Sequence, residues 1–216
     1  MKHLKIRSIT LLLAFLSVGF TYSAIAQGDK KSTAILDAMS SKYQKMKSFK
    51  ANFTYTPEGG KPLKGDVTVK GAKYRLSIAG QEIYNDGKLM ATYIKETNEV
   101  NLQDYDPAEA GELDPTKIYT AYKNGYRHAF IKEQKSGSRT LELIQLTSTS
   151  KNSQVAKVEL LIDKVDKTIK NWKIFQKNGS QVNYTVDQFK PNLTVADSYF
   201  TFNSKQYPGV EVVDLR

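Results

Sequence analysis

The side chains that most often perform covalent or acid–base chemistry are scarce in this sequence of 216 residues. Cys is absent, and His occurs only as His3 and His128. The lack of Cys excludes disulfides, thiolate nucleophiles and thiolate metal sites. His128 lies in an apolar and aromatic stretch, and no Gly-x-Ser-x-Gly motif occurs anywhere in the chain. We therefore expect His128 to be structural or exposed, and we expect no catalytic residue and no enzyme activity.

An acidic cluster is the other candidate for chemistry. It could suggest calcium or a pair of catalytic carboxylates, and it consists of Asp104, Asp106, Glu109, Glu112 and Asp114. The cluster lacks the residue order of a calcium loop with its central Gly, and Pro107 interrupts it. Zinc would need several His, Cys or carboxylate ligands at suitable spacing. We therefore expect a solvated loop here, with no metal site and no cofactor.

The basic composition has three possible explanations. The formal net charge is +10, which would attract an anionic membrane surface weakly. The lysines are scattered singly and form no basic stripe interleaved with aromatic residues, so nucleic acid is not an expected partner. A solvated basic surface accounts for most of them.

The first 26 residues have the three parts of a secretory signal peptide. A basic start is followed by an apolar run and by small residues at the −3 and −1 positions, in Lys2, Lys5 and Arg7, Ile9–Leu16 and Ala24–Ala26. A membrane anchor is the alternative, but it needs roughly 20 strongly apolar residues, and Ser17 and Gly19 dilute this run. We expect cleavage near Ala26 and export of residues 27–216 as a single domain.

Two periodicities follow in the remaining chain. Apolar residues recur at helical spacing between Ser32 and Met46, where Ser32 or Thr33 is placed to cap a helix. Beyond Ser48 the period changes to two, and turn signals such as Asn85-Asp86-Gly87 separate the segments. This pattern predicts about ten strands, the last at Phe200–Phe202. A second helix is expected to begin at Pro115.

Alternation through so many strands predicts an antiparallel sheet with one apolar face. Such a face must be covered by curling of the sheet or by helices. Two helices are too few to cover an apolar face of this size, so one interpretation is that a cavity or groove for an apolar ligand lies between them and the sheet. A fully packed barrel or sandwich core is the other, and the pattern by itself favours it.

Several motifs follow one another in a fixed order: an N-terminal helix ending in Tyr43–Phe53, the strand Gly65–Lys70, the pair Tyr74-Arg75, the hairpin Asp86–Lys88 with Tyr93, and the finish Phe200–Phe202 before Pro208–Asp214. Together they span most of the chain after residue 26. This order of motifs resembles the LolA family of periplasmic lipoprotein carriers. Each motif is weak alone, and the fixed order carries the resemblance.

The resemblance implies an α+β fold that is mainly antiparallel β: an unclosed half-barrel of about ten strands covered by short helices that form a lid. Alternation and the resemblance together predict a lipid-binding cavity lined by Phe53, Tyr55, Val67, Val69, Tyr74, Leu76, Ile78 and Tyr93. The predicted lid residues are Ile118, Tyr119 and Tyr122. We expect this lid to be mobile, with the Asp104–Asp114 loop as its hinge.

One departure from the family concerns the lid. Many relatives carry Arg-Pro after the strand that ends here at Lys70, and that arginine holds the lid shut. Gly71-Ala72 stand at these positions, so only Lys70 or Lys73 are candidate substitutes.

The resemblance also implies partners. A monomeric carrier would take lipoproteins, by their acyl chains, from an inner-membrane ABC-type releasing complex and deliver them to an outer-membrane acceptor. The alternative is a related half-barrel module that binds another lipid or glycolipid, or a regulatory protein partner.

Overall fold

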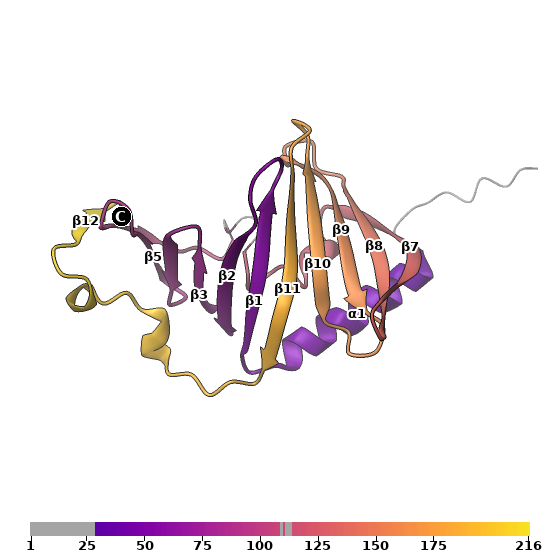
Figure 1. Ribbon diagram of the computed structural model, residues 1–216, viewed down its shortest axis with the longest axis horizontal. Helices are drawn as coiled ribbons and strands as arrows, with labels where there is room; N and C mark the ends of the chain where they lie inside the picture. The colour runs from indigo at the N-terminus through magenta and orange to yellow at the C-terminus, as the bar shows by residue number, and fades with distance from the viewer. Residues whose placement is uncertain (1–28, 109, 111–113) are drawn as a thin grey trace, which may run out of the picture.

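The computed structural model describes residues 29–108, 110 and 114–216, and within them one α-helix accompanies a single sheet of twelve strands (Figure 1). The helix is α1 (Lys30–Lys45). The strands are β1 (Phe49–Pro57), β2 (Leu63–Lys70), β3 (Lys73–Ile78), β4 (Gln81–Asn85), β5 (Leu89–Ile94), β6 (Glu99–Asp104), β7 (Tyr126–Ser136), β8 (Arg139–Ser148), β9 (Val155–Asp163), β10 (Ile169–Gln176), β11 (Gln181–Pro191) and β12 (Glu211–Asp214). The signal peptide predicted for residues 1–26 lies outside the described residues.

The sheet is open. Its strand order is β12-β6-β5-β4-β3-β2-β1-β11-β10-β9-β8-β7, with β12 and β7 at the two edges. Every neighbouring pair is antiparallel except β12 and β6, which run parallel. The predicted open, mainly antiparallel sheet is therefore confirmed, but the count of about ten strands was too low.

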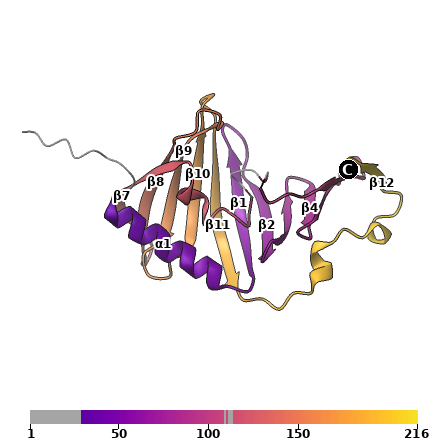
Figure 2. The ribbon, with the colours of Figure 1, turned by 180° about the vertical axis from the view of Figure 1, so that it is seen from behind.

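Helix α1 lies across one face of the sheet, which we call the inner face (Figure 2). Its apolar stripe buries Ile35, Leu36, Met39 and Tyr43 against the strands. The cap is Asp29 rather than Ser32 or Thr33: its Oδ1 accepts a hydrogen bond from the backbone N–H of Ser32 at 2.6 Å. The helix therefore begins slightly earlier than the spacing of apolar residues predicts.

The lid helix predicted from Pro115 is wrong as an α-helix. Residues 115–120 form turns, and only the short 3₁₀-helix η1 (Ala121–Lys123) follows. The carboxylate of Asp114 accepts hydrogen bonds from the backbone N–H and the hydroxyl of Thr116, and the backbone bonds that follow mix i,i+4 and i,i+3 spacing, so that single turns form without a continuous α-helix. Pairing of Lys123 N–H with Thr120 C=O continues the i,i+3 pattern.

The C-terminal chain covers part of the opposite, outer face, over β4, β5 and β6. It leaves β11, passes the ends of the central strands and reaches β12 at the far edge (Figure 1). The segment contains the 3₁₀-helices η2 (Asp197–Phe200) and η3 (Ser204–Gln206). The strand predicted at Phe200–Phe202 is thus wrong, because Phe200 is a buried anchor and the strand pairing is made by β12.

Candidate functional site

The inner face contains an apolar cavity of about 190 Å³. It is bounded by β1, β2, β3, β10, β11, α1 and the turn that begins at Asp114, and its lining is Tyr43, Phe49, Ala51, Phe53, Val67, Leu76, Ile78, Pro115, Ile118, Ile169, Trp172, Tyr184, Val186 and Phe189. An engineered apolar cavity of about 150 Å³ stays dry and binds benzene. The space present is therefore large enough for part of an acyl chain, and a longer chain needs the cover to move.

Five of the predicted site residues line this cavity. They are Phe53, Val67, Leu76, Ile78 and Ile118. The first four alternate along β1, β2 and β3, so that their side chains share the inner face. The structure thus brings the central part of the predicted cavity together.

The other residues predicted on the cavity strands lie beside it or away from it. Val69 and Tyr74 are on the same face but are buried in the adjoining core. Tyr55 packs against Tyr184 at 5.2 Å between ring centroids, next to the cavity. Tyr93 points to the outer face, where its ring lies 4.3 Å from that of Tyr207. The prediction that Tyr93 lines the cavity is therefore wrong: its side chain is buried on the outer face, beneath the C-terminal segment.

Strands β10 and β11 supply lining residues that the sequence reading missed. Trp172, Tyr184, Val186 and Phe189 all belong to these two strands. The alternation in β10 and β11 was visible in the sequence, but the pairing of β1 with β11 that brings them to the cavity was not. That pairing joins residues more than 120 positions apart.

Beside the cavity, the ring of Phe53 packs closely against the backbone at Gly65. A Cβ atom built at this position would lie 2.7 Å from Cζ of Phe53 and 2.7 Å from the carbonyl oxygen of Ser77. Phe53 is paired with Gly65 across β1 and β2, so its ring lies over the glycine. Gly65 therefore allows the ring of Phe53 to lie against the sheet, where a side chain at position 65 would displace it.

The cavity is covered by residues 114–123, which we call the cover segment. The ring of Tyr119 stacks on that of Tyr43 with centroids 5.3 Å apart. The hydroxyl of Tyr122 donates to Oδ1 of Asp37 at 2.5 Å, and that of Tyr105 donates to Asp114 at 2.8 Å. Burial, and next the hydrogen bond to Asp37, raise the pKa of Tyr122 above its ordinary value. Tyr119 and Tyr122 therefore attach the cover segment to α1 and do not line the cavity.

The two lysines considered as substitutes for the family arginine have another partner. Nζ of Lys70 and Nζ of Lys73 each lie 2.8 Å from a carboxylate oxygen of Asp197. Asp197 belongs to η2 on the C-terminal segment. These lysines therefore attach the C-terminal segment and not the cover segment.

The candidate chemical residues hold structural positions. Asp114, expected in a solvated loop, is instead buried at the turn it closes, whereas Asp104 and Asp106 are exposed; Glu109 and Glu112 lie outside the described residues. Nδ1 of His128 is 2.8 Å from Oγ of Ser32 at the start of α1. Across the described ranges, no group of three or more His, Asp or Glu side chains is arranged to hold a metal. In the same ranges no helix has the length and apolar character needed to cross a membrane.

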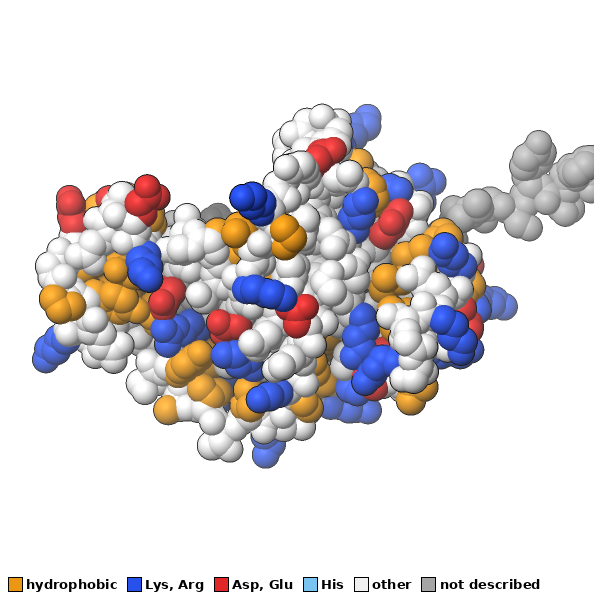
Figure 3. Space-filling view, viewed as in Figure 1, with side chains coloured by type: hydrophobic (Ala, Val, Ile, Leu, Met, Phe, Trp, Pro, Cys, Tyr) orange, Lys and Arg blue, Asp and Glu red, His pale blue; other side chains and the backbone are white. Residues whose placement is uncertain are grey.

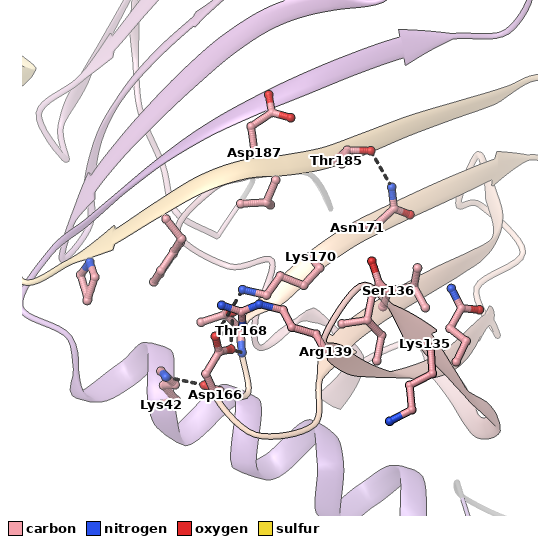
Figure 4. A pocket seen from close by; sticks show the side chains of 16 residues that line it. Lys42, Lys135, Ser136, Arg139, Asp166, Thr168, Lys170, Asn171, Thr185 and Asp187 are labelled. Atoms are coloured by element: carbon pink, nitrogen blue, oxygen red, sulfur yellow. Dashed lines mark hydrogen bonds and ion pairs between the residues drawn. The ribbon is translucent and has the colours of Figure 1, made fainter.

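A second, larger hollow of about 780 Å³ lies near the start of β10 and beside α1, and charged, polar and apolar side chains share its lining (Figure 4). Nη1 of Arg139 is 2.9 Å and Nζ of Lys170 is 3.3 Å from Oδ2 of Asp166. Lys42 donates to the carbonyl of the same residue. Lys and Arg are dispersed among Asp and Glu over the outer face (Figure 3). The hollow is lined by charged and polar side chains as well as apolar ones, whereas the smaller cavity is lined by aliphatic and aromatic side chains. The smaller cavity is therefore the better candidate site for an apolar ligand.

Residues 22–180 match the model of the family described as outer membrane lipoprotein carrier protein LolA. The chain belongs to the LolA family. This confirms the resemblance inferred from the order of motifs. No curated protein matches the chain.

Solved structures show the same LolA-like fold at low sequence identity. An uncharacterized conserved protein from Thermus thermophilus is 13% identical, with 84% of this chain and 98% of that chain covered and a TM-score of 0.57. The crystal structure of MucB is 14% identical, with 87% and 67% covered and a TM-score of 0.53. At such identities the likeness establishes the fold alone.

Proposed function

We propose that this protein is a periplasmic carrier that binds the acyl chains of lipoproteins in the inner-face cavity and takes them from the inner to the outer membrane. The observation that carries the proposal is the apolar cavity beneath a cover segment, in a chain of the LolA family. Each CH₂ group removed from water contributes roughly 0.8 kcal/mol. A cavity lined by aromatic and aliphatic side chains can therefore hold acyl chains without a covalent intermediate.

The same arrangement suits a carrier that must also release its ligand. Val67, Leu76 and Ile78 are only half-buried, so a bound chain at β2 and β3 stays partly in contact with water. Incomplete shielding limits affinity and permits transfer to an acceptor of higher affinity. The proposed partners are an inner-membrane ABC-type releasing complex and an outer-membrane acceptor.

A charge placed in the cavity tests this function. Leu76→Lys should lower the affinity for a synthetic lipopeptide with three acyl chains by roughly 100-fold or more, because an unpaired cation in an apolar site is strongly unfavourable. Ser77→Lys is the matched control: Ser77 is on the same strand but the outer face, paired with Glu82 and Asp66. Binding is measured by native mass spectrometry and calorimetry.

The outcomes separate the alternatives. Loss of lipopeptide binding in Leu76→Lys but not in Ser77→Lys supports the cavity as the site. Equal binding by both variants contradicts it. A glycolipid that binds where the lipopeptide does not would favour the other lipid-binding role. MucB has been crystallised in complex with MucA(peri); recovery of a protein partner with no bound lipid would favour a regulatory role of that kind.

A further inference from the structure

We propose that the indole N–H of Trp172 is the hydrogen-bond donor that receives the carbonyl group linking an acyl chain to its headgroup, so that the cavity selects ester- or amide-linked chains. This inference rests on the proposed lipid-binding function. It adds a polar recognition point to a cavity that otherwise recognises only apolar surface.

The first observation is an unpaired donor. Nε1 of Trp172 is buried, and no acceptor in the described part of the chain lies within hydrogen-bond distance. A buried Trp N–H usually finds a partner, and leaving it unpaired is costly. A buried water needs two to four polar partners, whereas the cavity walls around Trp172 are aliphatic and aromatic. Nε1 is out of reach of solvent in the closed structure, so an acceptor carried in by a ligand would satisfy this donor once the cover segment moves.

The second observation is the position of the ring. Trp172 and Ile118 line both the 190 Å³ cavity and a neighbouring space of about 30 Å³ under β8, β9 and β10. They are therefore the wall between the two spaces. A chain too long for the larger space must displace Ile118, which belongs to the cover segment, and then passes along Trp172.

The third observation is that the indole is held in place. It stacks on Tyr184 with ring centroids 4.8 Å apart and planes at 20°, and Tyr184 packs in turn on Tyr55. Leu160 lies directly opposite Trp172 on β9. A donor fixed by such packing loses little conformational entropy when an acceptor arrives.

Two lipids that differ only at the carbonyl test the proposal. Monomyristoylglycerol carries an ester carbonyl, and 1-O-tetradecylglycerol has the same headgroup and an ether in its place. The wild-type protein should bind the ester about tenfold more tightly, the size expected when a buried donor gains or lacks its acceptor. Trp172→Phe keeps an aromatic ring without the donor and should bind both lipids equally. Phe175→Leu, on the outer face of the same strand, should keep the preference.

A second measurement needs no variant. Trp172 is the only Trp in the chain, so its indole N–H gives a single signal in a ¹H–¹⁵N spectrum. That signal should move downfield with the ester lipid and much less with the ether lipid. Equal affinity for the two lipids, or the same shift with both, overturns the role of Trp172 while leaving lipid binding intact. Failure of both lipids to bind the wild-type protein overturns the proposed function together with this inference.

Discussion

The two faces of the sheet are covered by irregular segments that differ in how they are attached. On the outer face the C-terminal segment (residues 192–216) packs aromatic rings into a continuous cluster with β4, β5 and β6. On the inner face the cover segment spans a cavity. A cover made of turns therefore closes the strands beneath it completely only when it is anchored at several points.

The C-terminal segment has anchors of three kinds. The side chain of Phe200 is fully buried, and Phe202 and Tyr207 stack with ring centroids 4.9 Å apart. The hydroxyls of Tyr207 and Tyr84 are 2.6 Å apart, beside Glu82. Strand β12 then pairs with β6. This segment is therefore part of the folded sheet.

The cover segment has fewer anchors. Its side chains reach α1 through the Tyr119 stack and the Tyr122 hydrogen bond, and its turn is closed locally by Asp114. The backbone hydrogen bonds that begin within residues 114–123 end in the same stretch or at its immediate neighbours. A segment attached in this way can separate from the strands without breaking the sheet.

The largest difference should appear on removal of the outer-face anchor. Phe200→Ala should lower the free energy of unfolding by about 3–5 kcal/mol, the usual cost of emptying a buried Phe site. Urea denaturation followed by circular dichroism measures it. Phe175→Ala is the control, because Phe175 is only half-buried and should cost less. A loss below about 1 kcal/mol in Phe200→Ala would show that the C-terminal segment is also loosely attached.

The inner-face cover should respond differently. Tyr119→Ala removes the stack on Tyr43 and should cost about 1 kcal/mol of stability. It should also raise lipid affinity by up to about fivefold, because less free energy is then needed to open the cavity. Amides of residues 114–123 should exchange hydrogen faster in the variant, and in the wild type they should already exchange faster than those of β12.

A matched change on the outer face tests whether this effect belongs to the cover segment alone. Phe202→Ala loosens the C-terminal segment and should leave lipid affinity unchanged. If Tyr119→Ala weakens lipid binding, or if residues 114–123 exchange as slowly as β12 with and without lipid, the cover segment is a fixed wall.

Alternation in the sequence was sufficient to place β1, β2 and β3 and the side chains that share their inner face. It failed at Tyr93, because the same alternation is expected when either face of a strand is buried, and at β5 the buried face is the outer one. The C-terminal cover that causes this is formed by residues more than 100 positions away. Local pattern contains no information on which face such a distant segment covers.

The residues missed in the cavity have a similar cause. Trp172 and Tyr184 reach it only because β11 pairs with β1 and β10 with β11, a topology that period-two patterns do not specify. The lid helix failed although Asp114 accepts from Thr116 as a helix cap would. The backbone hydrogen bonds that follow alternate between i,i+4 and i,i+3 spacing and end at Asn124, so the segment remains a series of single turns. Sequence reasoning thus predicted the sheet and the family motifs, and it misjudged the elements that cover the sheet.

The smallest expected effect is the pH dependence of one outer-face anchor. Hydrogen bonds from Lys70 and then Lys73, with the attraction of both charges, lower the pKa of Asp197 to about 2. An unfolded Asp has a pKa of about 3.9, so the folded state holds the ionised form more strongly. The stability contributed by Asp197 is therefore complete above about pH 4 and is lost as the pH falls through about 2. Because the carboxylate is exposed, the effect is small and decreases in high salt.

Asp197→Asn should have a slightly lower urea midpoint than the wild type at pH 5, and the two midpoints should converge near pH 2. Adding Lys70→Met to the variant should cost little further stability, since Lys70 then has no carboxylate to pair with in η2 and keeps its hydrogen bond to the carbonyl oxygen of Val195. A gap between wild type and Asp197→Asn that persists to pH 2 would show that Asp197 acts through packing and not through its charge, and lipid affinity, set on the other face, should be the same in both proteins at pH 5.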